Sequence, residues 1–186
     1  MEQLVMLAKA PFKKATHTLP DGYKFVKFDG SEKDIAAWKT IEAEPPAPID
    51  GVDACYNNAI ANYHDIDLAN DVFFVEDENG QRVATFTVIT QQNGMGYLHM
   101  VKAMNSQRGK GIGHFMAEKS IEICAERGLN SIILTTDDFR LAAIKTYLDA
   151  GYHPVVYGEK DNEVNTRWDK VLKELNYPEV LRYNKD

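Results

Sequence analysis

The chain has 186 residues and a mass of 21.0 kDa, a length that fits one domain and is short for two. Apolar residues make up 44% of it and charged residues 26%, which excludes a chain that is disordered throughout and a collagen-like repeat. Mean hydropathy is -0.39, and no stretch approaches the roughly 18 consecutive apolar residues typical of a membrane span. The net charge of -7 argues against a general nucleic-acid binder.

The N-terminus and the cysteines indicate the compartment. Residues 1–7 lack a long apolar core followed by a small-residue cleavage site, so we expect no signal peptide. Cys55 and Cys124 are too few for a disulfide scaffold and lie in no Cys-x-x-Cys pair. We therefore expect reduced thiols in a cytoplasmic protein with no membrane partner. The five histidines are scattered without metal-ligand spacing, so the sequence predicts no metal site.

Charge is distributed unevenly along the chain. From Asp29 to Asn79 there are thirteen acids against two bases, Lys33 and Lys39, which makes this segment -11 and the remainder +4. Such a division favours a cationic substrate on one side of the site and an anionic one on the other. The alternative is that the acids merely cover the solvent-exposed sides of two helices.

The first half of the chain predicts helices followed by an antiparallel meander. Asn79-Gly80 and Asn93-Gly94 are hairpin turn signals between apolar runs. In chain order we expect a strand over 23–28, a helix after the capping box Ser31-x-x-Asp34, a proline loop over 45–48, a helix over 56–63, and strands over 72–76, 82–90 and 97–103.

The second half alternates helices and strands. In chain order we expect a helix over 112–124 with Gly128 at its C-terminal cap, a strand over 131–135, a helix from Asp137 or Asp138 to Ala150, a strand over 153–157, and a helix capped by Thr166 over about 166–176. The order predicts an α+β fold: a mixed sheet made of an antiparallel meander and βαβ units, with helices on both faces. We expect one domain over 1–186 with its core at about 19–158.

The most informative stretch is Gln107 to Gly113, between a strand and a helix. Its alternating glycines, Gly109, Gly111 and Gly113, allow backbone N–H groups to turn toward a ligand, and the helix that follows adds its positive end. Arg108 and Lys110 add charge suited to phosphate, although a glycine-rich turn alone is weak evidence.

Two familiar phosphate loops do not fit this stretch. A Walker A loop ends in Gly-Lys-Ser/Thr, and the dinucleotide fingerprint needs glycine where this chain has His114. What remains is Arg108-x-x-Gly111-x-Gly113, which resembles the pyrophosphate loop of the GNAT superfamily of acyl-CoA-dependent N-acyltransferases.

A second motif downstream strengthens the resemblance. The family carries Asn-x-x-Ala-x-x-x-Tyr-x-x-x-Gly-Phe on the next helix, and here Ala143, Tyr147 and Gly151 match it, Tyr152 is conservative, and Arg140 replaces Asn. The resemblance covers residues 72–157 well and the N-terminal third by architecture alone. It implies a GNAT-type sheet and acetyl-CoA as co-substrate.

The resemblance also implies binding residues. Residues 108–113 (Arg108, Gly109, Lys110, Gly111, Ile112 and Gly113) would hold the pyrophosphate. Arg140 and Ala143 correspond to positions that hold the pantetheine arm, although Arg lacks the acceptor of the usual Asn. Arg140 could instead reach a phosphate or a substrate carboxylate, or simply start the helix. The acyl carbonyl would bind a backbone N–H of the strand before the loop, at Val101, Lys102 or Ala103.

Two side chains are candidates for catalysis. Tyr147 corresponds to the family's general acid, which protonates the leaving thiolate, and its alternative role is packing at a helix interface. His99 lies where a histidine of one family member relays the amine proton through water, so it is the candidate base. A strand histidine can also be purely structural, and Glu42, Glu44 or water compete for the base role.

Taken together, the sequence predicts an N-acetyltransferase that moves an acetyl group directly from acetyl-CoA to a small, cationic primary amine. The alternative is a catalytically silent acyl-CoA sensor, and a nucleotide-binding oxidoreductase is a distant third. The sequence predicts no nucleic-acid partner and leaves open whether the chain forms a homodimer.

Overall fold

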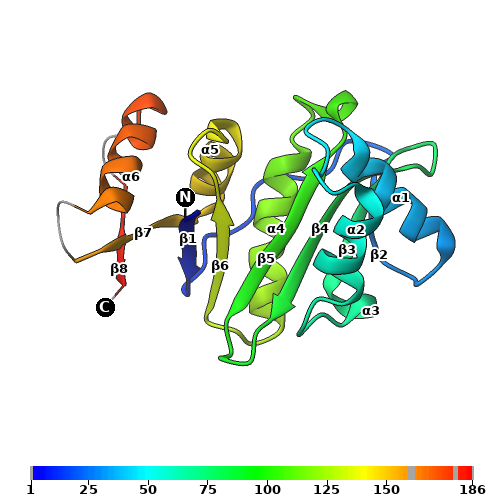
Figure 1. Ribbon diagram of the computed structural model, residues 1–186, viewed down its shortest axis with the longest axis horizontal. Coiled ribbons are helices and arrows are strands. Elements are labelled where there is room, and N and C mark those ends of the chain that lie inside the picture. The colour runs from blue at the N-terminus through cyan, green and yellow to red at the C-terminus, as the bar shows by residue number, and fades with distance from the viewer. Residues whose placement is uncertain (1, 159–161, 178–179, 186) are drawn as a thin grey trace.

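A computed structural model describes residues 2–158, 162–177 and 180–185. Its described residues form an eight-stranded sheet in the order β2-β3-β4-β5-β6-β1-β7-β8 (Figure 1). The strands are β1 (Leu4–Lys9), β2 (Lys24–Lys27), β3 (Val72–Glu76), β4 (Arg82–Thr90), β5 (Gly96–Ala103), β6 (Ser131–Thr136), β7 (His153–Tyr157) and β8 (Tyr183–Lys185). The helices are α1 (Glu32–Ala43), α2 (Val52–Tyr56), α3 (Leu68–Asp71), α4 (Ile112–Glu126), α5 (Leu141–Ala150) and α6 (Glu163–Glu174), with a π-helical turn η1 (Asn57–Ala61) and a 3-10 turn η2 (Asn105–Gln107).

The sheet is mixed, as predicted. Strands β2 to β5 pair antiparallel in sequence order, and β5 pairs parallel with β6. Strand β1 lies between β6 and β7 and runs antiparallel to both. The parallel pair β5–β6 is the point where the meander changes to strand-helix-strand connections.

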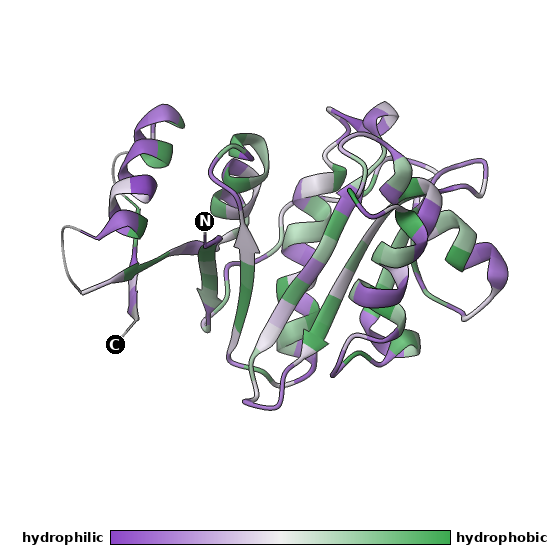
Figure 2. Cartoon of the chain, in the orientation of Figure 1, coloured by the Kyte–Doolittle hydropathy of each residue, from purple (hydrophilic) through white to green (hydrophobic). Residues whose placement is uncertain are grey.

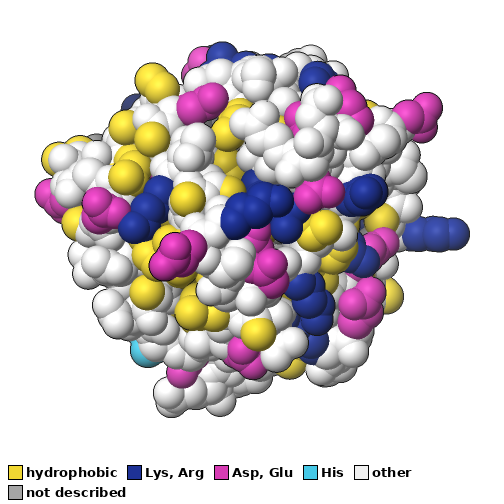
Figure 3. Space-filling view, turned by 90° about the vertical axis from the view of Figure 1, so that its right-hand side faces the viewer, with side chains coloured by type: hydrophobic (Ala, Val, Ile, Leu, Met, Phe, Trp, Pro, Cys, Tyr) yellow, Lys and Arg dark blue, Asp and Glu magenta, His cyan; other side chains and the backbone are white. Residues whose placement is uncertain are grey.

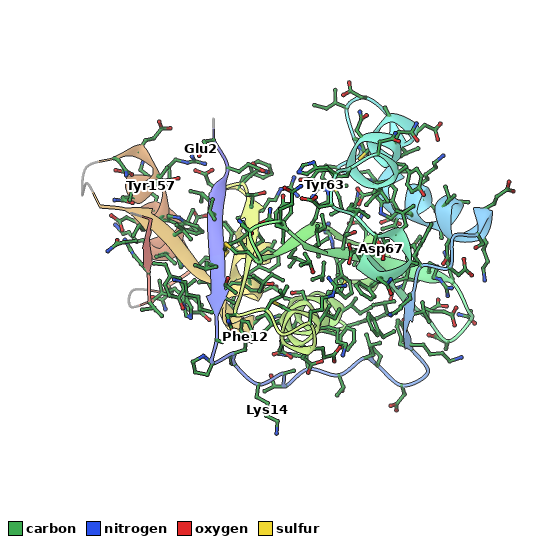
Figure 4. All side chains as sticks on the ribbon, turned by 90° about the horizontal axis from the view of Figure 1, so that it is seen from below. Glu2, Phe12, Lys14, Tyr63, Asp67 and Tyr157 are labelled. Carbon is green, nitrogen blue, oxygen red and sulfur yellow. The ribbon has the colours of Figure 1, made fainter. Side chains whose placement is uncertain are left out.

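Helices cover both faces of the sheet. In Figure 1, α1 and α2 lie in front of β3 and β4, whereas α4 lies behind the sheet, and Figure 4 shows these two layers edge-on. Helix α5 packs against α4, and α6 packs on β7 at the other end of the sheet. The α+β fold with helices on both faces is therefore confirmed.

The core forms between the sheet and these helices. Trp38 of α1 and Met116 of α4 are buried on opposite faces of β3 and β4, which contribute Phe74 and Phe86. In Figure 2 the lower part of β4 is green, whereas β5 carries hydrophilic residues toward its C-terminal end. A cavity lies against this part of β5.

Three local predictions were wrong. Helix α6 begins at Glu163 because Asn162 accepts the N–H of Asn165, so Thr166 does not cap it. Helix α5 has Arg140 at its cap position, because Asp137 and Asp138 are engaged in ion pairs instead. The helix expected over 56–63 is the short α2 followed by the π-helical turn.

Two strands of the sheet were not predicted from local pattern: β1 at residues 4–9 and β8 at residues 183–185. Strand β1 completes the sheet beside β6, where Leu4 pairs with Thr136 and Lys9 with Ser131. Within the described residues, no helix is long and apolar enough to cross a membrane.

Candidate active site

The sheet opens between β5 and β6. Their parallel pairing covers Gly96 to Leu98 and stops there. Beyond it, β5 bulges against β4: the register shifts between Thr85 and Thr87, and Met100 adopts a left-handed φ of 48°. A bulge bends and twists its strand, so the second half of β5 turns away from β6.

The bulge leaves backbone donors facing this opening. The N–H of Met104 donates to Val83 O on β4 at 2.9 Å. Because N–H groups alternate along a strand, the N–H of Lys102 also faces β4, and those of Val101 and Ala103 face the other side. Of the three predicted carbonyl donors, Val101 and Lys102 line the cavity, and alternation directs the N–H of Val101 away from β4.

A cavity of about 620 Å³ occupies the opening. Strand β5, strand β6, the start of α5 and the loop after α1 form its walls. The structure brings six of the predicted site residues to it: His99, Val101, Lys102, Arg140, Ala143 and Tyr147. Ala103, the last residue of β5, and the glycine loop lie outside this lining.

The glycine loop has the geometry of an anion site. Gly109 and Gly111 have φ of 78° and 76°, which side chains rarely tolerate, and a Cβ on either would meet nothing within 4 Å. Gly111 stands at the N-terminal cap of α4, so open backbone and the positive helix end coincide. Gly113 and Ile112 lie in the first turn of α4.

The two cations of the loop differ in their partners. The ammonium of Lys110 donates to Tyr23 Oη at 2.8 Å and to Gln107 Oε1 at 3.1 Å. The side chain of Arg108 is exposed and makes no hydrogen bond or ion pair with any other described residue, although its backbone N–H donates to Asn105 O. Arg108 is thus the loop cation that is free for a phosphate.

Tyr147 is half-buried on the cavity wall, and its hydroxyl has no hydrogen-bond partner among the described residues. Burial raises the pKa of Tyr147 to about 12, against a smaller opposing effect of the Arg140 charge. The phenol therefore keeps its proton at neutral pH, as a general acid must.

His99 is also half-buried, and its Nε2 lies 3.0 Å from Ala59 O. Because a carbonyl oxygen only accepts, Nε2 carries the hydrogen and the lone pair of the neutral ring is on Nδ1. Burial lowers the pKa of His99 below its usual range, while the Ala59 contact opposes this shift. His99 is therefore neutral at pH 7 and able to accept a proton.

The side chain of Lys102 fixes the part of the cavity wall formed by the end of α1 and the proline loop. Its ammonium donates to the carbonyl oxygens of Glu42, Glu44 and Pro46 at 2.8, 2.7 and 3.1 Å. These carbonyls end α1 and begin the proline loop, so a cation placed there also suits the helix dipole. The carboxylate of Glu42 lies 3.6 Å from the same ammonium and lines the cavity.

Glu42 and Glu44, the two acids that compete with His99 for the base role, differ in whether they line the cavity. Burial raises the pKa of Glu42, and the Lys102 charge opposes this shift. Glu44 accepts the backbone N–H of Asn105 through a short hydrogen bond and does not line the cavity. Glu42 is consequently the acid that can contact an acceptor.

Sequence reasoning missed part of the cavity wall. The proline run predicted a loop, and the structure shows that Pro46 to Ile49 of this loop face the cavity, as do Cys55 and Tyr97. Gln3 also lines it, and no local signal could have found that residue, because it depends on the placement of β1. The described residues contain no group of three or more His, Cys, Asp or Glu arranged to hold a metal ion.

Comparison with known proteins agrees with this geometry. Residues 34–152 match the acetyltransferase (GNAT) family. The chain belongs to this family. The family's general reaction is transfer of an acyl group from acyl-CoA to an amine. No curated protein matches the sequence.

Solved structures share the fold. The GCN5-related N-acetyltransferase from Sphaerobacter thermophilus is 19% identical with a TM-score of 0.62, over 81% of this chain and 47% of that one. An acetyltransferase of the GNAT family from Colwellia psychrerythraea is 20% identical with a TM-score of 0.60, over 82% and 53%. The chain thus spans about half the length of these two proteins. The ribosomal-protein-S18-alanine N-acetyltransferase from Escherichia coli is 19% identical with a TM-score of 0.55, over 69% and 76%.

Proposed function

We propose that the chain transfers an acetyl group from acetyl-CoA to a primary amine of a small, cationic acceptor by direct transfer. The observation that carries the proposal is the convergence of three groups on one cavity: the N–H of Val101, which points away from β4, the hydroxyl of Tyr147 and Nδ1 of His99. Acetyl-CoA supplies an activated acyl group and a thiolate leaving group.

Each of the three groups meets one need of the reaction. As the C–N bond forms, His99 Nδ1 takes the proton of the amine, directly or through a water. The N–H of Val101 donates to the carbonyl oxygen while that oxygen gains negative charge. As the C–S bond breaks, Tyr147 gives its proton to the sulfur. The products are an amide and a thiol, and His99 returns its proton to solvent while Tyr147 regains one.

The glycine loop would position the co-substrate. Backbone N–H groups of Gly109 to Gly113, the N-terminus of α4 and Arg108 would hold the pyrophosphate. Ala143 and Arg140 would line the path of the pantetheine arm toward Val101. Correct placement of the thioester matters because an oriented pair of reactants reacts far faster than a free pair.

The preference for a cation rests on one carboxylate. Of the acids in residues 29–79, Glu42 lines the cavity, where its carboxylate also lies 3.6 Å from the Lys102 ammonium. Several of the others are paired: Asp34 and Glu76 with Arg82, Asp71 with Arg127, and Asp53 with Lys39. Figure 3, which views the end with β2, α1 and α3, shows basic and acidic side chains side by side without a continuous acidic surface.

The experiment compares matched cationic and anionic amines as acceptors, at low and high salt. We expect higher kcat/KM for the cationic amines, declining as salt screens the charge. Glu42→Gln should reduce that preference by about fivefold, as expected for a partly screened ion pair of about 1 kcal/mol. The control is Glu32→Gln, on an exposed residue of the same helix.

Other outcomes identify the alternatives. A preference for acidic acceptors would contradict the cationic assignment and indicate Arg140 as a carboxylate-binding residue. If acetyl-CoA raises the melting temperature but no acceptor in a broad amine screen is acetylated, the chain is an acyl-CoA sensor and the proposed activity is wrong.

A further inference from the structure

Arg167, in the first half of α6, is an internal cation far from the glycine loop in sequence. Its Nε and Nη2 donate to the two carboxylate oxygens of Asp138 at 2.7 and 2.6 Å. Its Nη1 donates to the carbonyl oxygen of Glu2 at 2.7 Å. The side chain is only 10% exposed, and its hydrogen bonds lower the pKa of Asp138. The guanidinium therefore holds two separate backbone segments in fixed positions.

Both segments lead directly into the cavity wall. Asp138 lies on the loop from β6 to α5, between Thr136 and Arg140, which line the cavity. Glu2, labelled in Figure 4 at the start of β1, precedes Gln3, which also lines it. The neighbouring carboxylate of Asp137 accepts from Arg140 Nε at 2.9 Å and from Gln3 Nε2 at 3.3 Å.

Arg140 differs from Arg167 because its guanidinium group keeps hydrogen-bond donors that are not in use. The side chain of Arg140 is 51% exposed and stacks on Phe139, with 5.6 Å between guanidinium carbon and ring centre. Its hydrogen bond to Asp137 uses Nε, so both terminal nitrogens remain without hydrogen-bond partners among the described residues. A cation with free donors on a cavity wall suits an anionic oxygen of a substrate.

We infer that Arg167 is a positioning residue for Arg140, acting through Asp138 on the loop that carries Arg140, so that Arg140 can bind an anionic oxygen of the substrates. The inference rests on the proposed acyl transfer. Contacts other than those of Arg167 also dock α6: Trp168 is fully buried and donates to Val155 O at 3.1 Å. Val171 and Leu172 bury the rest of that face of α6.

The test is Arg167→Lys, which keeps the charge but loses the two-pronged contact with Asp138. We expect the Kd for CoA, measured by calorimetry, to rise about tenfold, because small displacements of a binding group cost large factors. The matched control is Arg127→Lys. Arg127 also bridges a carboxylate, Asp71 at 2.9 Å, and a carbonyl, Val88 O at 2.6 Å, away from the cavity.

A double-mutant cycle separates positioning from general stability. In an Arg140→Met background, Arg167→Lys should no longer change the Kd for CoA, since its effect passes through Arg140. An equal rise in both backgrounds would overturn the inference, and so would a folded Arg167→Lys protein in which neither the Kd for CoA nor the acceptor KM changes. If Arg167→Lys does not fold, Asp138→Asn replaces it in the same cycle with the same expectation.

The same experiments show which anion Arg140 binds. They also separate failure of this inference from failure of the proposed function. If Arg140 binds an acceptor carboxylate instead of a phosphate of CoA, the acceptor KM rises while the Kd for CoA stays unchanged, and the positioning role holds with the acceptor as ligand. A wild-type chain that does not bind CoA would contradict the proposed function itself, whatever Arg167 does.

Discussion

Two clusters of ionisable side chains lie on this molecule, and they differ in how far their polar atoms are already engaged. In the cavity, the hydroxyl of Tyr147, Nδ1 of His99 and the terminal nitrogens of Arg140 keep free hydrogen-bonding capacity. On the outer side of α4 lies a strap formed by residues 10–22. The polar groups that hold this strap in place form hydrogen bonds with one another. Figure 4 shows the strap passing beneath α4, with Phe12 and Lys14 labelled on it.

The second cluster centres on Glu118. Its carboxylate accepts the N–H groups of Thr16 and His17 at 2.8 and 2.7 Å, and it also binds both of their side chains. His17 stacks on His114, which lies 3.3 Å from Asp149. Buried polar groups that are fully paired stabilise a unique packing, whereas unpaired ones are available for chemistry. We therefore propose a catalytic role for the cavity cluster and a stabilising role for the strap cluster.

The largest effect should come from Tyr147→Phe. This change keeps the ring and removes the hydroxyl, so kcat should fall by about 100-fold, the usual contribution of a positioned acid. The Kd for CoA and the melting temperature should stay near the wild-type values. Steady-state kinetics and a thermal melt check both parts, and unchanged turnover would mean that the thiolate leaves unassisted.

His99→Gln should lower kcat/KM by about tenfold, at the weaker end of general-base effects. In the wild type, activity needs neutral His99, whose pKa burial lowers below 6.5, so kcat/KM should fall as the pH drops through that lowered pKa. The variant should lose this acid limb. His153→Gln is the control, because burial also lowers the pKa of His153, which lies on β7 outside the cavity lining. Identical pH profiles for His99→Gln and the wild type would rule out His99 as the base.

Glu118→Gln should leave kcat/KM unchanged and lower stability. Burial alone would raise the pKa of Glu118, but the hydrogen bonds from His17 and Thr16 outweigh it and lower that pKa to about 2. Its contribution is thus complete at neutral pH and is lost as the pH falls from about 4.5 toward 2.

We expect the free energy of unfolding at pH 7 to drop by about 1–3 kcal/mol, as for hydrogen bonds to a charged group. The difference from the wild type should shrink as the pH approaches 3. Glu122→Gln is the control, since that half-exposed acid of α4 pairs only with Lys119 among the described residues. Denaturant melts of the three proteins decide the question, and a Glu118→Gln protein as stable as the wild type would refute the role of the strap.

Local and long-range contacts differ in how far they can be predicted from the sequence. Elements from Val72 to Tyr157 follow local signals, namely hairpin turns, helical spacing and glycine caps, and all of them are present in the structure. Strand β1 was missed because its continuous apolar run, Leu4 to Ala8, has no alternation or flanking turn that marks a strand. Its place is set by pairing with β6 more than a hundred residues away.

The candidate site was predictable to the extent that it lies on motifs. The glycine loop and the helix with Ala143 and Tyr147 are encoded locally, so their residues could be named in advance. The bulge at Met100, the capping of α1 by Lys102 and the Arg167–Asp138 contact depend on partners distant in sequence. Such contacts follow from tertiary packing, which local pattern does not report.

We propose that the glycine loop at the start of α4 holds acyl-CoA beside the open half of β5. The most direct test is the melting temperature with and without acetyl-CoA, in the wild type, Gly111→Val and Gly94→Val. Gly94 has φ of 78° and equally open space for a Cβ, but it lies in the β4–β5 turn, so it reproduces the strain without touching the loop. We predict that acetyl-CoA raises the melting temperature of the wild type and Gly94→Val and leaves Gly111→Val unchanged. An equal rise in all three proteins would contradict the claim.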